Sequence, residues 1–154
     1  TPLTQGAGTG HFHVRPYYFK DHTADIAMAV TGASLPELFE HAAEGLATQL
    51  FSAPEKLKEY KTAQKKIELA APGREDLFID WLNELIYLFY DEGFLFKNAA
   101  FEKLLEDDLE CSVEGHLIPK PDRIYSKEIK AATYHDLRIE EKAGMFQAKV
   151  ILDI

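Results

Sequence analysis

The sequence predicts an α+β fold, a two-layer sandwich in which two main helices pack on one face of a largely antiparallel mixed sheet. Three observations lead to this prediction. A strand-like segment precedes the first helix, two long segments carry apolar residues at helical spacing, and several strand-like segments follow the second helix in succession. Strands that follow one another without an intervening helix pair readily as antiparallel neighbours, which favours this fold class.

The first strand is predicted over residues 26–32, after an aromatic and extended stretch at 17–20. Bulky and small side chains alternate from Ile26 to Thr31, which is the period of a strand with one buried face. By the same alternation, Asp25 lies on the face of the small residues, opposite the face that should enter the core.

Two helices are predicted, over residues 35–51 and 74–91. Ser34 and Glu37 have the spacing of a capping box at the start of the first helix, which then carries one wide apolar stripe. The second helix starts after a Pro-Gly pair, is apolar around most of its circumference, and should end at Gly93. Both helices are therefore expected to be buried against the sheet.

Further strands are predicted over residues 59–70, 94–106, 109–118, 128–140 and 145–153. If the last hairpin, with Lys-Ala-Gly at its tip, closes around residues 141–144, Asp136 lies opposite Lys149. The same register places Ala132 opposite Asp153 and makes Lys130 a near neighbour of Asp153 on the polar face. A register shift of one residue would move every side chain to the opposite face of the sheet.

Composition restricts the classes of function. A chain of 154 residues fits one domain, expected over residues 16–154, and residues 1–15 are expected to be a flexible leader or a cloning remnant. The formal charge of −9 argues against a surface built to bind nucleic acid. The single cysteine, Cys111, excludes an intrachain disulfide framework, and no apolar run approaches a membrane span. We expect a cytoplasmic protein without membrane attachment.

Acidic and imidazole groups gather where the DHTAD segment leads into the first strand, at Asp21, His22 and Asp25. They either cap a turn or contribute to a site with Asp153, which is otherwise a solvent-facing strand terminus. Such oxygen and imidazole ligands suit a divalent cation, and Ca, Mg, Mn and Zn are not distinguished. Carboxylates placed close together repel one another, and either a cation or Lys130 would relieve that repulsion.

No motif for a catalytic centre accompanies this cluster. The sequence contains no glycine-rich phosphate loop, no nucleophile elbow and no HExxH. We interpret His41 as structural, and His116 and His135 have no ligand-like spacing to a partner. His11 and His13 form an HxH pair on the leader, which by itself does not indicate a metal site. We therefore assign no catalytic residue.

Separated blocks of the sequence resemble the archease family, in the order and spacing of that family from residue 17 to residue 154. The blocks are DHTADIAMAV, SLPELFEHAAEGLATQLF, LFIDWLNELIYLFYDEGFLF, EIKAATYHDLRIE and the closing VILDI. The resemblance implies an α+β sandwich and an accessory protein of tRNA splicing, not an enzyme. Such a protein activates a GTP-dependent RNA ligase, promoting its guanylylation and its repeated turnover in a chaperone-like role.

The resemblance also implies a metal site, for which calcium is one candidate. The closing aspartate of the family's DHTAD motif falls on Asp25 and the penultimate aspartate on Asp153. Asp21 and His22 are further candidate ligands, and Lys130 is expected near the site. The implied partner is the ligase, through a protein–protein contact, with RNA reached only indirectly; the oligomeric state is left open.

Two other hypotheses compete with an activator. A metal-dependent phosphoester hydrolase could use the same acidic cluster, but it would need a base and a substrate pocket. A direct RNA chaperone would rely on the lysines between Lys56 and Lys66, and the negative charge of the chain argues against it.

Overall fold

The computed structural model describes residues 16–21 and 25–154. The helices are α1 (Leu35–Leu50), α2 (Arg74–Glu92) and two short 3-10 helices, η2 (Pro54–Glu59) and η3 (Lys120–Tyr125). The strands are β1 (Tyr17–Asp21), β2 (Asp25–Gly32), β3 (Thr62–Ala70), β4 (Phe94–Leu104), β5 (Asp108–Leu117), β6 (Ala131–Thr133), β7 (Ile139–Lys142) and β8 (Met145–Asp153).

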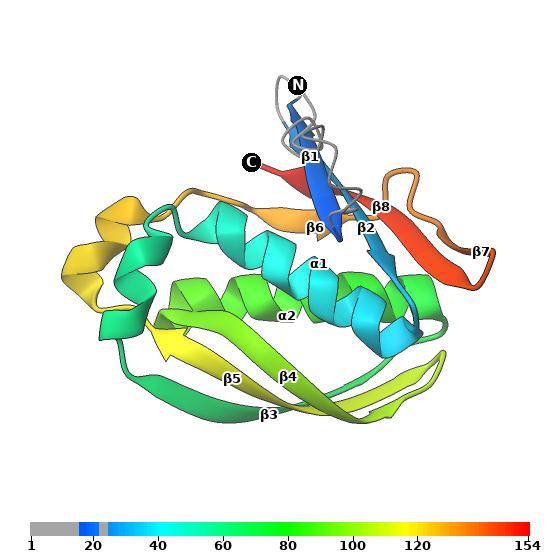
Figure 1. Cartoon of the computed structure of the whole chain (residues 1–154), viewed down its shortest axis with the longest axis horizontal. Coiled ribbons are helices and arrows are strands. Elements are labelled where there is room, and N and C mark those ends of the chain that lie inside the picture. Colours follow the sequence, from blue (N-terminus) through cyan, green and yellow to red (C-terminus); the bar gives the residue numbers. More distant parts are fainter. Residues whose placement is uncertain (1–15, 22–24) are drawn as a thin grey trace.

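The two main helices lie between two antiparallel sheets (Figure 1). One sheet has the order β1-β2-β8-β6, with β7 also paired to β8, and the other has the order β3-β5-β4. The α+β class, the antiparallel strands and both main helices are confirmed. The strands do not form one sheet on one side of the helices, however. Because α2 buries residues on most of its circumference, a single sheet would leave part of that apolar surface in water.

The capping box at the start of α1 is present. The Ser34 hydroxyl accepts from the Glu37 backbone N–H at 3.2 Å, and the Glu37 carboxylate accepts from the Ala33 N–H at 2.7 Å. These bonds satisfy backbone donors that a helix start leaves without intrahelical partners. The sequence therefore determines where α1 begins through local contacts alone.

Gly93 ends α2 as predicted. It adopts a left-handed φ of 72°, and its N–H donates to the carbonyl of Phe89 at 2.8 Å. A Cβ at this position would lie 2.7 Å from the Ile118 carbonyl oxygen. Only glycine meets both conditions without strain.

Trp81 lies at the centre of the core between the two sheets. Its side chain is fully buried, and its indole N–H donates to the Phe39 carbonyl of α1 at 2.9 Å. Its ring lies 6.1 Å from the Phe96 ring and 5.5 Å from the Phe101 ring, measured between centroids. One residue of α2 thus contacts α1 and the smaller sheet together.

The segment expected as one strand over residues 128–140 is divided into β6 and β7. The chain turns between them: the Leu137 N–H donates to the Tyr134 carbonyl at 2.9 Å, and Asp136 adopts a φ of 53°. Aspartate tolerates this left-handed conformation better than most residues, and no periodic pattern reports it. The prediction that Asp136 pairs with Lys149 was wrong for this reason, since Asp136 belongs to neither strand.

The tip of the final hairpin lies at the expected Lys-Ala-Gly segment, but the turn is tighter than predicted: Ala143 and Gly144, with φ angles of 52° and 77°, fit a two-residue turn of type I′. Lys142 pairs with Met145 across this turn. Beyond the inserted turn between β6 and β7 the register changes, so that Ala131, rather than the predicted Ala132, lies opposite Asp153. Neither main helix combines the length and the apolar character that crossing a bilayer would require, within the part of the chain that the structure describes.

Candidate acidic site at the end of the larger sheet

Asp25 and Asp153 are directly opposite one another across β2 and β8. The antiparallel register runs from this pair to Gly32 and Phe146 without interruption. In such a pair the Cβ atoms lie about 4.5–5.5 Å apart, on the same face of the sheet. Asp25 is half-buried and Asp153 is exposed. Like charges so placed destabilise a sheet, and a cation between them would remove that penalty.

The apolar residues of both strands enforce this register. Met28 and Val30 of β2, with Val150 and Leu152 of β8, are buried in the core against the helices. A shift of one residue would turn these side chains to the opposite face and bring polar ones inside. The long apolar strand pair therefore fixes where the two aspartates meet, more than a hundred residues apart in the sequence.

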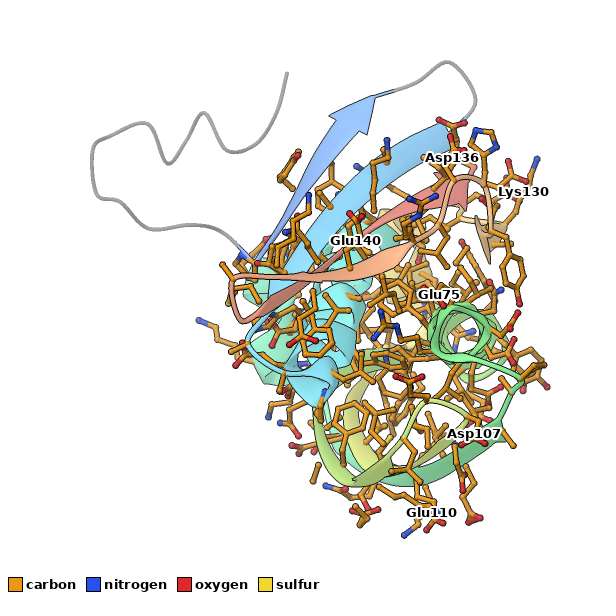
Figure 2. The ribbon with its side chains drawn as sticks, turned by 90° about the vertical axis from the view of Figure 1, so that its right-hand side faces the viewer. Glu75, Asp107, Glu110, Lys130, Asp136 and Glu140 are labelled. Atoms are coloured by element: carbon orange, nitrogen blue, oxygen red, sulfur yellow. The ribbon has the colours of Figure 1, made fainter. Side chains whose placement is uncertain are left out.

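Lys130 lies beside the pair through its backbone. Its N–H donates to the carbonyl of Asp153 at 2.7 Å, and the next residue, Ala131, pairs with Asp153 in the sheet. Figure 2 shows Lys130 at the end of the sheet where β2 begins. Its side chain is exposed. The structure thus brings Asp25, Asp153 and Lys130 together, as the sequence predicted.

Asp21 and His22 are placed less completely. Asp21 closes β1 and its backbone pairs with Ile26, one position along β2 from Asp25. His22 lies outside the described residues. Within residues 16–21 and 25–154, no group of three or more histidine, cysteine, aspartate or glutamate residues could hold a metal ion. The two facing carboxylates have the oxygen chemistry that a hard divalent cation prefers, so the donor type fits such an ion.

Asn83 and Tyr90 of α2 hold the segment that carries Lys130. The Asn83 amide accepts from the Ala132 N–H at 2.8 Å and donates to the Ala132 carbonyl at 3.2 Å. The Tyr90 hydroxyl accepts from the Ile129 N–H at 2.7 Å and donates to the Lys127 carbonyl at 2.8 Å. The backbone around Lys130 is therefore anchored on both sides.

A third contact of the same kind lies at the N-terminal end of α2. The Ile139 carbonyl accepts from the Arg74 guanidinium at 2.8 Å, and the Ile139 N–H donates to the Glu75 carboxylate at 3.1 Å. Side chains of α2 thus occupy backbone groups that a further strand would otherwise pair with, which protects an open sheet edge. Sequence reasoning missed these residues. The available signal was polar side chains at roughly two-turn spacing on a mostly apolar helix.

The face of the larger sheet that is turned away from the helices also carries a pocket of about 420 Å³. Polar and charged residues that line it include Tyr18, Thr31, Asp136, Arg138, Glu140 and Lys149. Thr31 and Lys149 share the face of Asp25 and Asp153, because they stand at even spacing along the same strands. The acidic pair and this polar hollow therefore belong to one surface.

The model of the archease protein family matches residues 17–154. The archease of Methanosarcina mazei is 31% identical over 144 residues, which cover 91% of this chain and 97% of that protein. The archease of Archaeoglobus fulgidus is 33% identical over 138 residues, covering 90% and 98%.

Solved structures agree with the sequence relatives. The solution structure of protein 1598 from Methanobacterium thermoautotrophicum superposes with a TM-score of 0.72 at 28% identity, over 92% of this chain and 100% of that one. The crystal structure of an archease from Thermotoga maritima, described as a possible chaperone, gives a TM-score of 0.64 at 28% identity, over 94% and 100%. The similarity therefore extends over the whole domain and is not confined to one motif.

Proposed function

The chain belongs to the archease family, and from this premise we propose that it is an accessory protein that activates a GTP-dependent RNA ligase of tRNA splicing. In this proposal it acts through a divalent cation held by Asp25 and Asp153. The observation that carries the proposal is the direct pairing of these two aspartates at the end of β2 and β8.

The position of the acidic pair favours presentation to a partner over enclosure of a substrate. Asp153 is exposed and is the last residue of β8. The other face of this strand packs in the core. A bound cation would supply positive charge against the phosphate charge that develops during nucleotidyl transfer. The residues of this chain would hold and orient that charge at the edge of the sheet while the ligase carries out the chemistry.

The sheet face beside the pair has the character of a contact surface for another protein. Arg138 and Lys149 lie there beside Asp136 and Glu140, so both signs of charge are available around the hollow. Figure 2 shows Asp136 and Glu140 on the side of the larger sheet. Mixed charges of this kind favour specific orientation of a partner. We assign this face, including the acidic pair, to the ligase contact.

Lys130 has a positioning role in this proposal. Tyr90 and Asn83 hold its flanking residues, and its own N–H holds the Asp153 carbonyl. These bonds restrict where the Asp153 side chain can lie relative to Asp25. A pre-arranged pair binds a cation with a smaller entropic cost than two independent side chains.

The test is a multiple-turnover ligation assay with the cognate ligase, comparing the natural protein with Asp25→Asn and Asp153→Asn. These variants keep the side-chain shape and remove the charge. We expect them to bind the ligase and to lose stimulation of turnover. Matched controls are Glu68→Gln and Glu110→Gln, which alter another directly opposed carboxylate pair on the smaller sheet and should stimulate normally.

Each outcome bears on a different part of the proposal. Full stimulation by both aspartate variants would overturn the role of the metal site. Absence of stimulation by the natural protein would overturn the accessory function. Turnover of a phosphodiester or phosphomonoester by the isolated protein would favour the hydrolase hypothesis instead.

A further inference from the structure

A pocket separate from the acidic pair lies between the C-terminal half of α1, η2 and the beginning of β4. Its volume is about 590 Å³, within the range of small-molecule sites. Its apolar walls include Tyr17, Phe51, Leu57, Leu95 and Phe96. Figure 1 shows η2 close to the end of α1, at the left of the molecule. Neither Asp25 nor Asp153 lines this pocket.

The ionisable groups of the pocket are two lysines, Lys97 and Lys127, one histidine, His116, and one acid, Glu44. Lys127 makes no ion pair with any residue that the structure describes, and Lys97 has only a distant one, to Glu114 at 3.9 Å. Other lysines of the chain are held more closely, such as Lys65 at 2.6 Å from Glu92. The pocket therefore carries an excess of positive charge on a chain whose net charge is −9.

His116 adds an unusual feature. Its side chain is 9% exposed, and its Nδ1 has no hydrogen-bond partner within the described part of the chain. Burial, assisted by the nearby Lys97, lowers the pKa of His116, so the imidazole is neutral at neutral pH. A buried polar atom without a partner is rare in native structures and calls for an explanation.

We propose that this pocket binds a small organic anion with an aromatic or aliphatic body. The apolar walls would bury the body, while Lys97 and Lys127 would contact the anionic group at the mouth, where both lysines are exposed. Charge complementarity selects an anion over a cation, because two lysines face one glutamate. Glu44 is half-buried, and burial raises its pKa, so its ionised form is disfavoured there and opposes an anion less than an exposed carboxylate would.

The test uses three probes of the same shape with the full chain: 2-naphthoate, 2-naphthalenemethanol and 2-naphthylmethylammonium. Binding is measured by calorimetry and by amide chemical-shift changes in a ¹⁵N-labelled sample. We expect 2-naphthoate to bind tightest and the ammonium compound weakest. The shifts should concentrate at Thr48, Leu57, Lys97 and His116, which line the pocket on different elements.

Single substitutions distinguish specific recognition of the anionic probe from nonspecific binding. Lys97→Gln and Lys127→Gln should each weaken naphthoate binding by about two- to fivefold, the effect of one partly exposed ion pair. Glu44→Gln should strengthen it, because Glu44 is the one acidic side chain among the described residues that line the pocket. Lys142→Gln, at the distant hairpin tip, is the matched control and should leave the affinity unchanged.

Blocking the pocket with a larger side chain gives an independent test of where the probe binds. Thr48 is exposed on α1 and lines the pocket, so Thr48→Trp should block the probe without disturbing the core. Equal binding of the three probes, unchanged affinity in both lysine variants, or the absence of shifts at the lining residues would each overturn the proposal. Asp25→Asn and Asp153→Asn should bind naphthoate normally, so failure of the acidic-site proposal is distinguishable from failure of this one.

Discussion

Asn83 of α2 pairs with both backbone groups of Ala132, accepting from its N–H at 2.8 Å and donating to its carbonyl at 3.2 Å. A side chain thus takes the position that a neighbouring strand would have at the edge of β6. This contact joins the helix layer to the strand that adjoins Asp153. The side-chain amide of Asn83 therefore contributes to the stability of the fold and also holds the strand that lies beside the acidic site.

Asn83→Asp tests this contact. The substitution keeps the acceptor but removes the donor, which leaves the carbonyl of buried Ala132 facing a carboxylate. We expect a loss of about 1–3 kcal/mol in the free energy of unfolding, the usual penalty for an unsatisfied polar group. Urea denaturation measures it. Asn98→Ala is the control, because exposed Asn98 donates to the half-buried Glu114 side chain rather than to the backbone of the sheet edge, and its effect should be clearly smaller.

Gly93→Ala and Gly144→Ala form a pair that separates two sources of strain. Both glycines have a positive φ, of 72° and 77°, so an alanine at either one costs about 1–2 kcal/mol in backbone conformation. At Gly93 the new Cβ would also lie 2.7 Å from the Ile118 carbonyl, whereas at Gly144 nothing lies within 4 Å. Thermal unfolding should therefore show Gly93→Ala as the more destabilised variant. Equal effects would refute the close approach.

Removal of divalent ions should reveal the repulsion between Asp25 and Asp153. In a chelator, Asp25→Asn should unfold at a higher temperature than the natural protein, because the facing like charges are gone. Adding Ca²⁺, Mg²⁺, Mn²⁺ or Zn²⁺ should then stabilise the natural protein and leave the variant unchanged, since a ligand stabilises only the state that binds it. An ion that raises both melting temperatures equally would act elsewhere.

Cys111 should be inert in the folded protein. It is fully buried on β5, and burial raises the pKa of its thiol from 9.0 to about 12. A thiol-specific disulfide reagent at pH 8 should therefore react only as fast as the protein unfolds, since the thiolate is the reactive form. Rapid modification under native conditions would contradict this placement.

The same thiol contributes to the dependence of stability on pH. Between pH 9.0 and about 12 the unfolded chain loses the thiol proton while the folded chain retains it, so the free energy of unfolding falls as the pH rises. Below pH 9.0 both states are protonated and the contribution is fully present. Cys111→Ala should be less stable overall but should show a shallower decline across this interval, measured by urea denaturation at several pH values.

Local patterns predicted much of the fold. Ser34 and Glu37 located the start of α1, Gly93 located the end of α2, and strict alternation placed Asp25 and Asp153 on the face away from the core. These predictions succeeded because each signal is contained within a few residues. A site of Asp25 with Asp153 was one alternative that the residues left open and the one that the family resemblance implied, and their role as metal ligands stays a prediction.

Contacts between residues that are far apart in the sequence could not be predicted from local patterns. The turn at Asp136 divided a segment that looked continuous, and beyond it Ala131, one residue from the predicted Ala132, lies opposite Asp153. The pairing of Asn83 with Ala132 and the pocket around His116 depend on elements that meet only after folding. The polar residues at two-turn spacing on α2 do not identify Ala132 as a partner, and the pocket leaves no periodic trace in the sequence.

The amino-acid order was therefore sufficient for the helices, their ends, the facing of each long strand and the family. The division into two sheets, the choice of neighbour for each strand and the meeting of Asp25 with Asp153 were decided by tertiary structure. The physical reason is the range of the forces involved. Caps, turns and alternation are settled by nearby atoms, whereas sheet pairing is settled by burying the apolar surface of the whole chain, above all both sides of α2.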